Sequence, residues 1–112
     1  LYYSFQTKTI QPLKTKGVCL GIDRDMGFSS CLEEKSMPVK SGDVLLLYSD
    51  GITEAMNSNH HLFDQSRLDS ALKESAHFPA EKIIECINLR LDEFVQSEEP
   101  HDDVTLVAIK VK

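Results

Sequence analysis

The sequence has little of what marks disulfide-rich, membrane or secreted proteins. Its 112 residues contain three cysteines, Cys19, Cys31 and Cys86, and this odd number at wide spacing argues against a disulfide framework or a zinc knuckle. No apolar run approaches the roughly 20 residues of a membrane helix, and no signal peptide is visible. We therefore expect a cytoplasmic protein with free, buried thiols and no membrane contact in this segment.

A basic stripe is also missing, although the chain is well charged. The formal net charge is −6, which argues against nucleic acid as a partner, because neutralising phosphates requires clustered Lys and Arg. The negative charge does not argue against a phosphoprotein as the substrate, since metal ions can hold its phosphate. The composition, 41% hydrophobic and 27% charged, is ordinary for a globular domain. Residues 1–112 show no repeat or linker, so we expect one domain, and the start at Leu1 inside an apparent strand suggests an incomplete one.

The hydrophobic pattern predicts strands first, then two helices, then a closing strand. We expect strands at 1–6 and 9–13 joined by a two-residue turn at Thr7-Lys8, and further strands at 31–39, 44–48 and 104–111. The unbroken apolar run at 44–48 predicts a strand buried on both faces.

Asp64 is a suitable N-cap for a helix at 65–75, and Pro79 suits the first turn of a second helix. A helical stripe follows Pro79: Ala80, Ile83, Ile84, Ile87, Leu91, Phe94 and Val95. This order of elements predicts an α+β fold with helices packed on an antiparallel sheet.

Two acidic sites stand apart from the general surface charge. Asp50 ends the most apolar strand and is followed by Gly51, which allows the backbone to approach a ligand closely. Asp102 and Asp103 directly precede the closing strand, and a divalent cation such as Mg²⁺ or Mn²⁺ would relieve the repulsion between their carboxylates. Taken singly, a turn at Asp50 and a strand start at Asp102 are the more common explanations, so these residues alone give a weak metal hypothesis.

The sequence around both sites resembles that of the metal-dependent (type 2C-like) serine/threonine phosphatases. Residues 42–55 read Gly-Asp-Val-Leu-Leu-Leu-Tyr-Ser-Asp-Gly-Ile-Thr-Glu-Ala, and residues 102–106 read Asp-Asp-Val-Thr-Leu. Both are similar to segments of the bacterial branch, the stage II sporulation E-like and sigma-factor-regulating phosphatases. Three further segments occur in the same order as in that family: the Gly-rich stretch at 17–22, the Leu62-Phe63 turn and the Arg67-Leu68 pair. In the first of them, Cys19 stands where proline is usual. The resemblance covers essentially the whole chain.

The resemblance implies a fold, a reaction and a ligand set. The fold is an antiparallel β-sandwich flanked by helices, of which residues 1–112 form the C-terminal part. The reaction is hydrolysis of phosphoserine or phosphothreonine with two Mn²⁺ or Mg²⁺ ions and no covalent enzyme intermediate. Asp50 and Asp102 are the implied metal ligands. Five further residues are implied to support them or to be structural: Gly51, Thr53, Glu54, Asp103 and Thr105.

The other metal-binding segments of that family, an early Asp and an Asp-x-x-Gly-His-Gly-type stretch, are not found in the sequence. We therefore expect the chain alone to be inactive and to require the N-terminal half of its domain. We also expect the isolated chain to form homo-oligomers, because a half-domain exposes sheet edges and apolar faces. The implied substrate is a phosphorylated regulatory protein of the anti-anti-sigma type. The alternative is a non-catalytic protein-interaction module in a partner-switching pathway.

Other candidate ligands are weaker. His60 and His61 are expected to be solvated loop residues. His101 leads into a strand rather than lying on a helix, which argues against a His-Asp phosphohydrolase site. The Asp23-Arg24-Asp25 stretch resembles the start of a calcium loop but lacks the rest of the ligand pattern.

Overall fold

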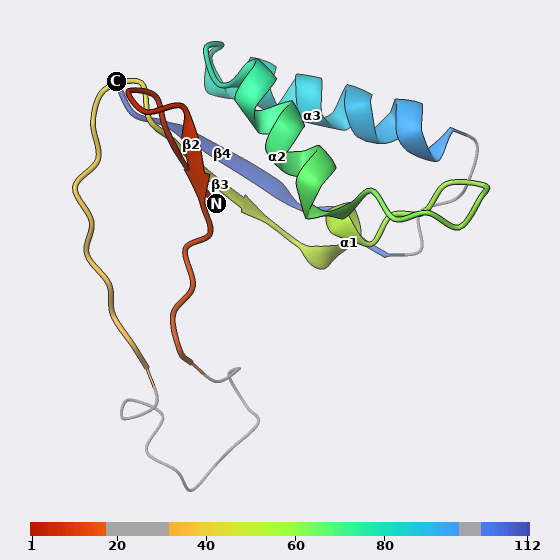
Figure 1. Cartoon of the computed structure of the whole chain (residues 1–112), viewed down its shortest axis with the longest axis horizontal. Helices are drawn as coiled ribbons and strands as arrows, with labels where there is room; N and C mark the ends of the chain where they lie inside the picture. The colour runs from red at the N-terminus through yellow and green to blue at the C-terminus, as the bar shows by residue number, and fades with distance from the viewer. Residues whose placement is uncertain (18–31, 97–101) are drawn as a thin grey trace, which may run out of the picture.

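The computed structural model describes residues 1–17, 32–96 and 102–112. Four strands form one antiparallel sheet in the order β2-β1-β3-β4, and two long helices lie together on one side of it (Figure 1). The elements are β1 (Tyr2–Ser4), β2 (Thr9–Gln11), β3 (Val44–Tyr48), α1 (Asp50–Thr53), α2 (Asp64–Ser75), α3 (Ala80–Val95) and β4 (Leu106–Lys110). The predicted α+β class is confirmed.

The hairpin of β1 and β2 is present, but its turn is longer than predicted. Ser4 pairs with Thr9, so four residues connect the strands rather than the two residues Thr7-Lys8. The Lys8 backbone adopts φ 58°, and its N–H donates to the Ser4 carbonyl at 2.9 Å. The turn closes through this left-handed residue, because the sequence lacks the Asn-Gly or Asp-Gly pair that a two-residue turn favours.

Strand β3 has the predicted bounds, but its expected burial on both faces is wrong. Val44 and Leu46 are fully buried, whereas Leu47 is 55% exposed. Since neighbouring side chains point to opposite faces of a sheet, the two helices cover only the face that carries Val44 and Leu46. Among the described residues nothing comparable covers the opposite face, to which Val107 and Ile109 of β4 also contribute exposed apolar side chains.

The core lies between this sheet and the two helices. Helix α3 packs against β4 and α2, and its predicted stripe is largely buried. Ile83, Ile87, Leu91 and Val95 belong to the buried cluster, while Ile84 is half-buried. Pro79 directly precedes α3, and its carbonyl accepts a hydrogen bond from the Ile83 N–H.

Helix α2 begins one residue earlier than predicted, at Asp64. The Asp64 carboxylate still accepts the backbone N–H of Arg67 at 3.0 Å, which is the bond expected of a capping side chain. At the other end, the Lys110 ammonium of β4 donates to the Ala76 carbonyl, just beyond the last turn of α2. A cation there complements the helix dipole, so this contact ties the sheet to the helix.

One predicted strand is wrong, and three are shorter than expected: β1 covers Tyr2–Ser4 rather than 1–6, β2 covers Thr9–Gln11 rather than 9–13, and the closing strand is also shorter. Residues 32–39 of the predicted 31–39 strand form no strand, and residue 31 lies outside the described residues. One backbone–backbone bond, from the Glu33 N–H to the Lys16 carbonyl, and two side-chain bonds, of Glu33 and Lys35, connect this stretch to residues 14–16. These contacts do not make a strand ladder, and Pro38 has no N–H to donate. The closing strand covers Leu106–Lys110 rather than 104–111, and Thr105 directly before it bonds to Ser49, beyond the end of β3.

Asp43 holds the end of the sheet that lies away from α1. It is buried, and its carboxylate accepts the Tyr2 hydroxyl at 2.6 Å, the Lys40 N–H at 2.7 Å and the Phe5 N–H at 2.9 Å. The Tyr2 hydroxyl, followed by these two N–H groups, lowers the pKa of Asp43, and the same contact raises the pKa of Tyr2. One ionised side chain therefore joins β1, its hairpin turn and the start of β3.

None of the described helices has the length and apolar character needed to cross a membrane. Cys86 carries a free, half-buried thiol, and Cys19 and Cys31 lie outside the described residues.

Candidate functional site

The candidate site lies where β3 ends and the chain approaches the start of β4. Asp50 is the first residue of α1, a helix of one turn, and its side chain is exposed. A carboxylate in the first turn of a helix is favourably placed relative to the helix dipole. Strand β3 leads into α1 at one end of the sheet (Figure 1). Asp50 therefore lies beyond one end of β3, and Asp43 directly precedes the other end.

Ser49 connects this tip to the residues that precede β4. Its hydroxyl donates to the Asp103 carbonyl at 3.0 Å and accepts the Thr105 N–H at 2.9 Å. Its backbone N–H donates to the Thr105 carbonyl at 3.0 Å. Three hydrogen bonds thus fix the chain just before Asp50 against the chain just after Asp102.

Gly51 is in even closer contact with that segment. A Cβ atom at this position would lie 2.5 Å from the Asp103 carbonyl oxygen and 3.5 Å from the Asp102 carbonyl oxygen. A side chain therefore cannot be placed here without moving the backbone. The sequence suggested close approach to a ligand at Gly51, and the structure shows instead close approach to the other acidic segment of this chain.

Asp102 and Asp103 have different roles in this contact. The Asp102 carboxylate accepts the Asp103 N–H at 2.8 Å and lines a pocket of about 430 Å³ beside α1. Asp103 contributes its backbone, through the carbonyl that meets Ser49 and Gly51. Both aspartates are exposed. The structure therefore brings the Asp50 and Asp102 segments together, although 52 positions separate them.

Thr53 and Glu54 close the short helix. The Thr53 hydroxyl and the Glu54 N–H both donate to the Asp50 carbonyl, at 3.2 and 2.9 Å. Thr105 joins the site through its backbone, as described for Ser49. These contacts orient the backbone at Asp50, while the Glu54 side chain is exposed and lines the same pocket as Asp102.

The donor set fits part of a divalent-metal site. Asp50 and Asp102 supply exposed carboxylate oxygens, which are the ligands that Mg²⁺ and Mn²⁺ favour. Within residues 1–17, 32–96 and 102–112, no group of three or more His, Cys, Asp or Glu side chains is arranged to hold a metal ion. A complete site would therefore need further donors, and the assignment of Asp50 and Asp102 as ligands stays a prediction.

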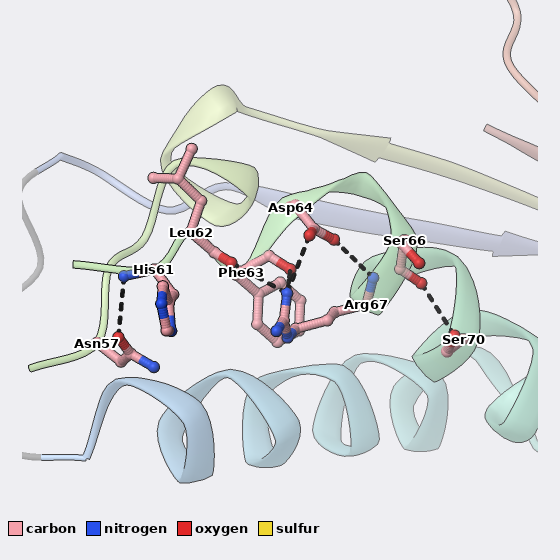
Figure 2. A network of polar contacts seen from close by, with 8 residues as sticks. All are labelled: Asn57, His61, Leu62, Phe63, Asp64, Ser66, Arg67 and Ser70. Atoms are coloured by element: carbon pink, nitrogen blue, oxygen red, sulfur yellow. Dashed lines mark hydrogen bonds and ion pairs between the residues drawn. The ribbon is translucent and has the colours of Figure 1, made fainter. Parts of the chain in front are cut away.

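The loop that follows α1 is held by Arg67 (Figure 2). The guanidinium pairs with Asp64 at 2.9 Å and donates to the Leu62 carbonyl at 3.2 Å. It also lies over the Phe94 ring, at 4.8 Å from the ring centroid. Phe63 packs edge-on against Phe94. The Arg-Leu pair noted in the sequence thus fixes the end of the loop to helices α2 and α3.

The two histidines of this loop do not join the acidic site. His60 and His61 are exposed, and His60 adopts φ 59°. The His61 N–H donates to the Asn57 side chain at 3.0 Å (Figure 2), which closes the loop. His101 and the 23–25 stretch lie outside the described residues.

Two residues with important contacts had no role in the sequence-based prediction. Ser49 was part of the quoted motif, and its place directly before Asp50 was the available signal. Asp43 was quoted only as part of the 42–55 segment, and an aspartate at such a position is common in turns. Its hydrogen bonds to Tyr2 and Phe5 reach 41 and 38 positions away, and no local pattern indicates those contacts.

Comparison with known proteins gives a consistent result. The family model described as "Stage II sporulation protein E (SpoIIE)" matches residues 1–112. The chain is 30% identical over 114 residues to "Phosphoserine phosphatase RsbU" of Bacillus subtilis (strain 168), covering 99% of this chain and 31% of that protein. It is 28% identical over 98 residues to "Protein IcfG" of Synechocystis sp., covering 87% of this chain and 14% of that protein. The chain thus spans about a third or less of these relatives.

A solved structure has a similar fold. The "SiaA-PP2C domain of Pseudomonas aeruginosa" superposes with a TM-score of 0.64 over 68% of this chain and 31% of that one, at 21% sequence identity. The match agrees with the predicted α+β phosphatase fold and with residues 1–112 forming only part of such a domain.

Proposed function

Because the chain belongs to the stage II sporulation protein E family, we propose that it is the C-terminal part of a metal-dependent phosphatase domain acting on phosphoserine or phosphothreonine in a protein. The relative that it matches over 99% of its length is named a phosphoserine phosphatase. Since the chain spans only 31% of that relative, the activity belongs to the complete domain. By complete domain we mean these residues together with the preceding part of the phosphatase fold.

The observation that carries the proposal is the contact between Gly51 and the Asp103 carbonyl. Reinforced by the hydrogen bonds of Ser49, it places the backbones of Asp50 and Asp102 at one edge of the fold. Their carboxylates would hold Mn²⁺ or Mg²⁺ together with donors from the rest of the domain. Such ions, when bound, supply positive charge that stabilises phosphoryl oxygens and acidifies water.

This chain's own residues have a positioning role in that reaction. The bonds from the Thr53 hydroxyl and the Glu54 backbone N–H to the Asp50 carbonyl fix the orientation of α1. Ser49 and Gly51 keep α1 at a constant separation from Asp102. The backbones that carry the two carboxylates are therefore held in place by strand β3 and a set of hydrogen bonds.

The isolated chain is expected to be inactive and to self-associate. Two carboxylates are too few to hold two ions, and the apolar sheet face around Leu47, Val107 and Ile109 is open. In the complete domain we expect the preceding half of the fold to cover this face. In the isolated chain, light scattering should detect dimers or larger species, and Leu47→Lys should reduce them. A monodisperse monomer would contradict this expectation.

We further propose a cytoplasmic regulatory protein of the anti-anti-sigma type as the substrate. The support is the "Phosphoserine phosphatase RsbU" relative and the absence of a basic surface stripe in the sequence. A phosphoprotein would be held mainly through its phosphate at the acidic site. Since the chain carries a net charge of −6, a cation would be needed between the phosphate and the carboxylates.

The test is hydrolysis of a phosphoserine protein by the complete domain with and without divalent metal. We expect turnover with Mn²⁺ or Mg²⁺, loss of turnover with a chelator, and recovery when metal is added back. Asp50→Asn and Asp102→Asn should each lower kcat by about 100-fold or more, because the lost charge stabilisation amounts to several kcal/mol.

The matched control is Asp92→Asn, which removes an exposed carboxylate on α3. It should leave kcat within about twofold of the wild type. Phosphoprotein binding without any turnover in either metal would reject the enzyme and favour the non-catalytic interaction module.

A further inference from the structure

The pocket beside Asp102 has both an acidic and an apolar side. Its volume is about 430 Å³, and it is lined by Gly51, Glu54, Ala55, Met56, Leu62 and Asp102. This size lies toward the lower end of pockets that hold small ligands. A pocket of this size has room for a long side chain of a bound protein.

The apolar side of the pocket is firmly built. Met56 and Leu62 face each other through an isolated antiparallel β-bridge that closes the loop between them. The Asn57 side chain accepts two backbone N–H groups inside that loop, and Arg67 donates to the Leu62 carbonyl (Figure 2). Leu62 nevertheless remains 44% exposed. A leucine held in place by its own backbone but open to solvent presents a preformed apolar contact surface.

Glu54 supplies the acidic side. No ion pair of Glu54 is found within the part of the chain that the structure describes, in contrast to Glu33, Glu74 and Glu85, which pair with Lys or Arg. If Asp102 binds metal, its charge is largely neutralised, and the Glu54 carboxylate is then the uncompensated charge of this pocket.

We propose that this pocket binds a lysine or arginine side chain of the phosphoprotein, close in sequence to the phosphorylated residue; this rests on the proposed function. The aliphatic stem of such a side chain packs on Met56 and Leu62 while its charged end reaches Glu54. An acidic side chain is rejected by like-charge repulsion, and a purely apolar one leaves Glu54 partly desolvated without a partner. Because the pocket shares Asp102 with the proposed metal site, the basic residue follows or precedes the phosphoserine by only a few positions.

The experiment uses the complete domain and a set of phosphoserine peptides. Each peptide carries a single Lys or a single Glu at one position within three residues of the phosphoserine, and kcat/KM is measured for each. At one position the wild type should prefer Lys over Glu by about fivefold, the effect of roughly 1 kcal/mol. Glu54→Gln should reduce this ratio toward one, and Glu54→Lys should invert it.

The ratio of kcat/KM for the Lys peptide to kcat/KM for the Glu peptide distinguishes substrate recognition from a structural role of Glu54. General damage to the site lowers kcat/KM for both peptides equally and leaves this ratio unchanged. Glu81→Lys, which changes an exposed charge in the first turn of α3, is the matched control and should leave the ratio unchanged. Circular dichroism checks that each variant is folded. An unchanged Lys/Glu ratio in Glu54→Lys, or no preference at any position in the wild type, overturns the proposal.

A second measurement separates this inference from the proposed function. Non-hydrolysable phosphonate analogues of the same peptides are titrated into the domain, and binding is followed by fluorescence anisotropy. If the wild type binds the Lys analogue more tightly and Glu54→Lys inverts this preference, the result supports the basic-residue pocket even when no peptide is hydrolysed. Hydrolysis of the peptides without any charge preference in binding or turnover supports the phosphatase and rejects the basic-residue pocket.

Discussion

Replacing Gly51 with alanine tests the contact that joins the two acidic segments. The added Cβ would lie 2.5 Å from the Asp103 carbonyl oxygen and 3.1 Å from its carbonyl carbon. Ordinary contacts begin near 3.4 Å, so one backbone must move by about 0.9 Å. Both neighbours are main-chain atoms held by Ser49, and neither can rotate away as a side chain would.

The expected cost has two parts. Overpacking of this kind lowers the free energy of unfolding by about 1–3 kcal/mol, which urea unfolding of the complete domain would measure. The same displacement moves Asp50 relative to Asp102, and a shift of about 1 Å in a catalytic arrangement lowers kcat by roughly 100-fold. We therefore expect the loss of kcat to exceed what the fraction of unfolded protein explains.

Two other glycines provide controls for Gly51→Ala. A Cβ on Gly17 would lie 3.6 Å from the nearest atom, a Leu32 methyl, so Gly17→Ala should change neither stability nor kcat. Gly42 has φ 90° and would clash with Phe5, so Gly42→Ala should destabilise the fold from the far end of β3 but leave kcat per folded molecule intact. A Gly51→Ala variant with near wild-type kcat would refute the reasoning.

The remaining predictions concern Asp43 and Ser49. The folded-state pKa of Asp43 is lowered, chiefly by the Tyr2 hydroxyl, so its stabilising contribution is complete well above pH 4 and is lost as the pH falls through the folded-state value. Thermal unfolding should therefore show that Asp43→Asn lowers Tm near pH 7, and that the difference from wild type shrinks below about pH 4; an equal difference at both pH values would contradict this. Ser49→Ala removes a donor and an acceptor and should lower the free energy of unfolding by about 1–2 kcal/mol in urea unfolding. Ser49→Thr, which keeps the hydroxyl, should retain most of the free energy of unfolding. An equal decrease in both variants would refute the role of the hydroxyl.

Helices α2 and α3 and the strand β3 could be predicted from the sequence because their signals are local, whereas the short helix α1 was not predicted. The stripe ending at Val95 has a clear helical period, and the apolar run at 44–48 lies between turn signals. The burial of β3 could not be predicted in the same way. An unbroken run is typical of a strand covered on both faces, but Leu47 is open because only one face is covered within the described residues.

The candidate site was predicted from the resemblance of its sequence motifs to a known family and not from geometry. Nothing local relates Asp50 to Asp102, and the contact that relates them, Gly51 against the Asp103 carbonyl, depends on how β4 pairs with β3. The turn at Thr7-Lys8 and the 31–39 strand were wrong for a related reason. Weak local signals were overridden by contacts with distant residues, such as the bond from the Phe5 N–H to the Asp43 carboxylate.

The most direct test of the central claim is a Mn²⁺ titration of the complete domain by isothermal calorimetry. The wild type, Asp50→Asn, Asp102→Asn and the Asp92→Asn control are compared, so the result does not depend on any substrate. We predict that the two site variants bind Mn²⁺ at least about 10-fold more weakly, since even groups that only orient metal ligands change affinity by that much, while the control matches the wild type. Unchanged Mn²⁺ affinity in both site variants would contradict the assignment of Asp50 and Asp102 as metal ligands.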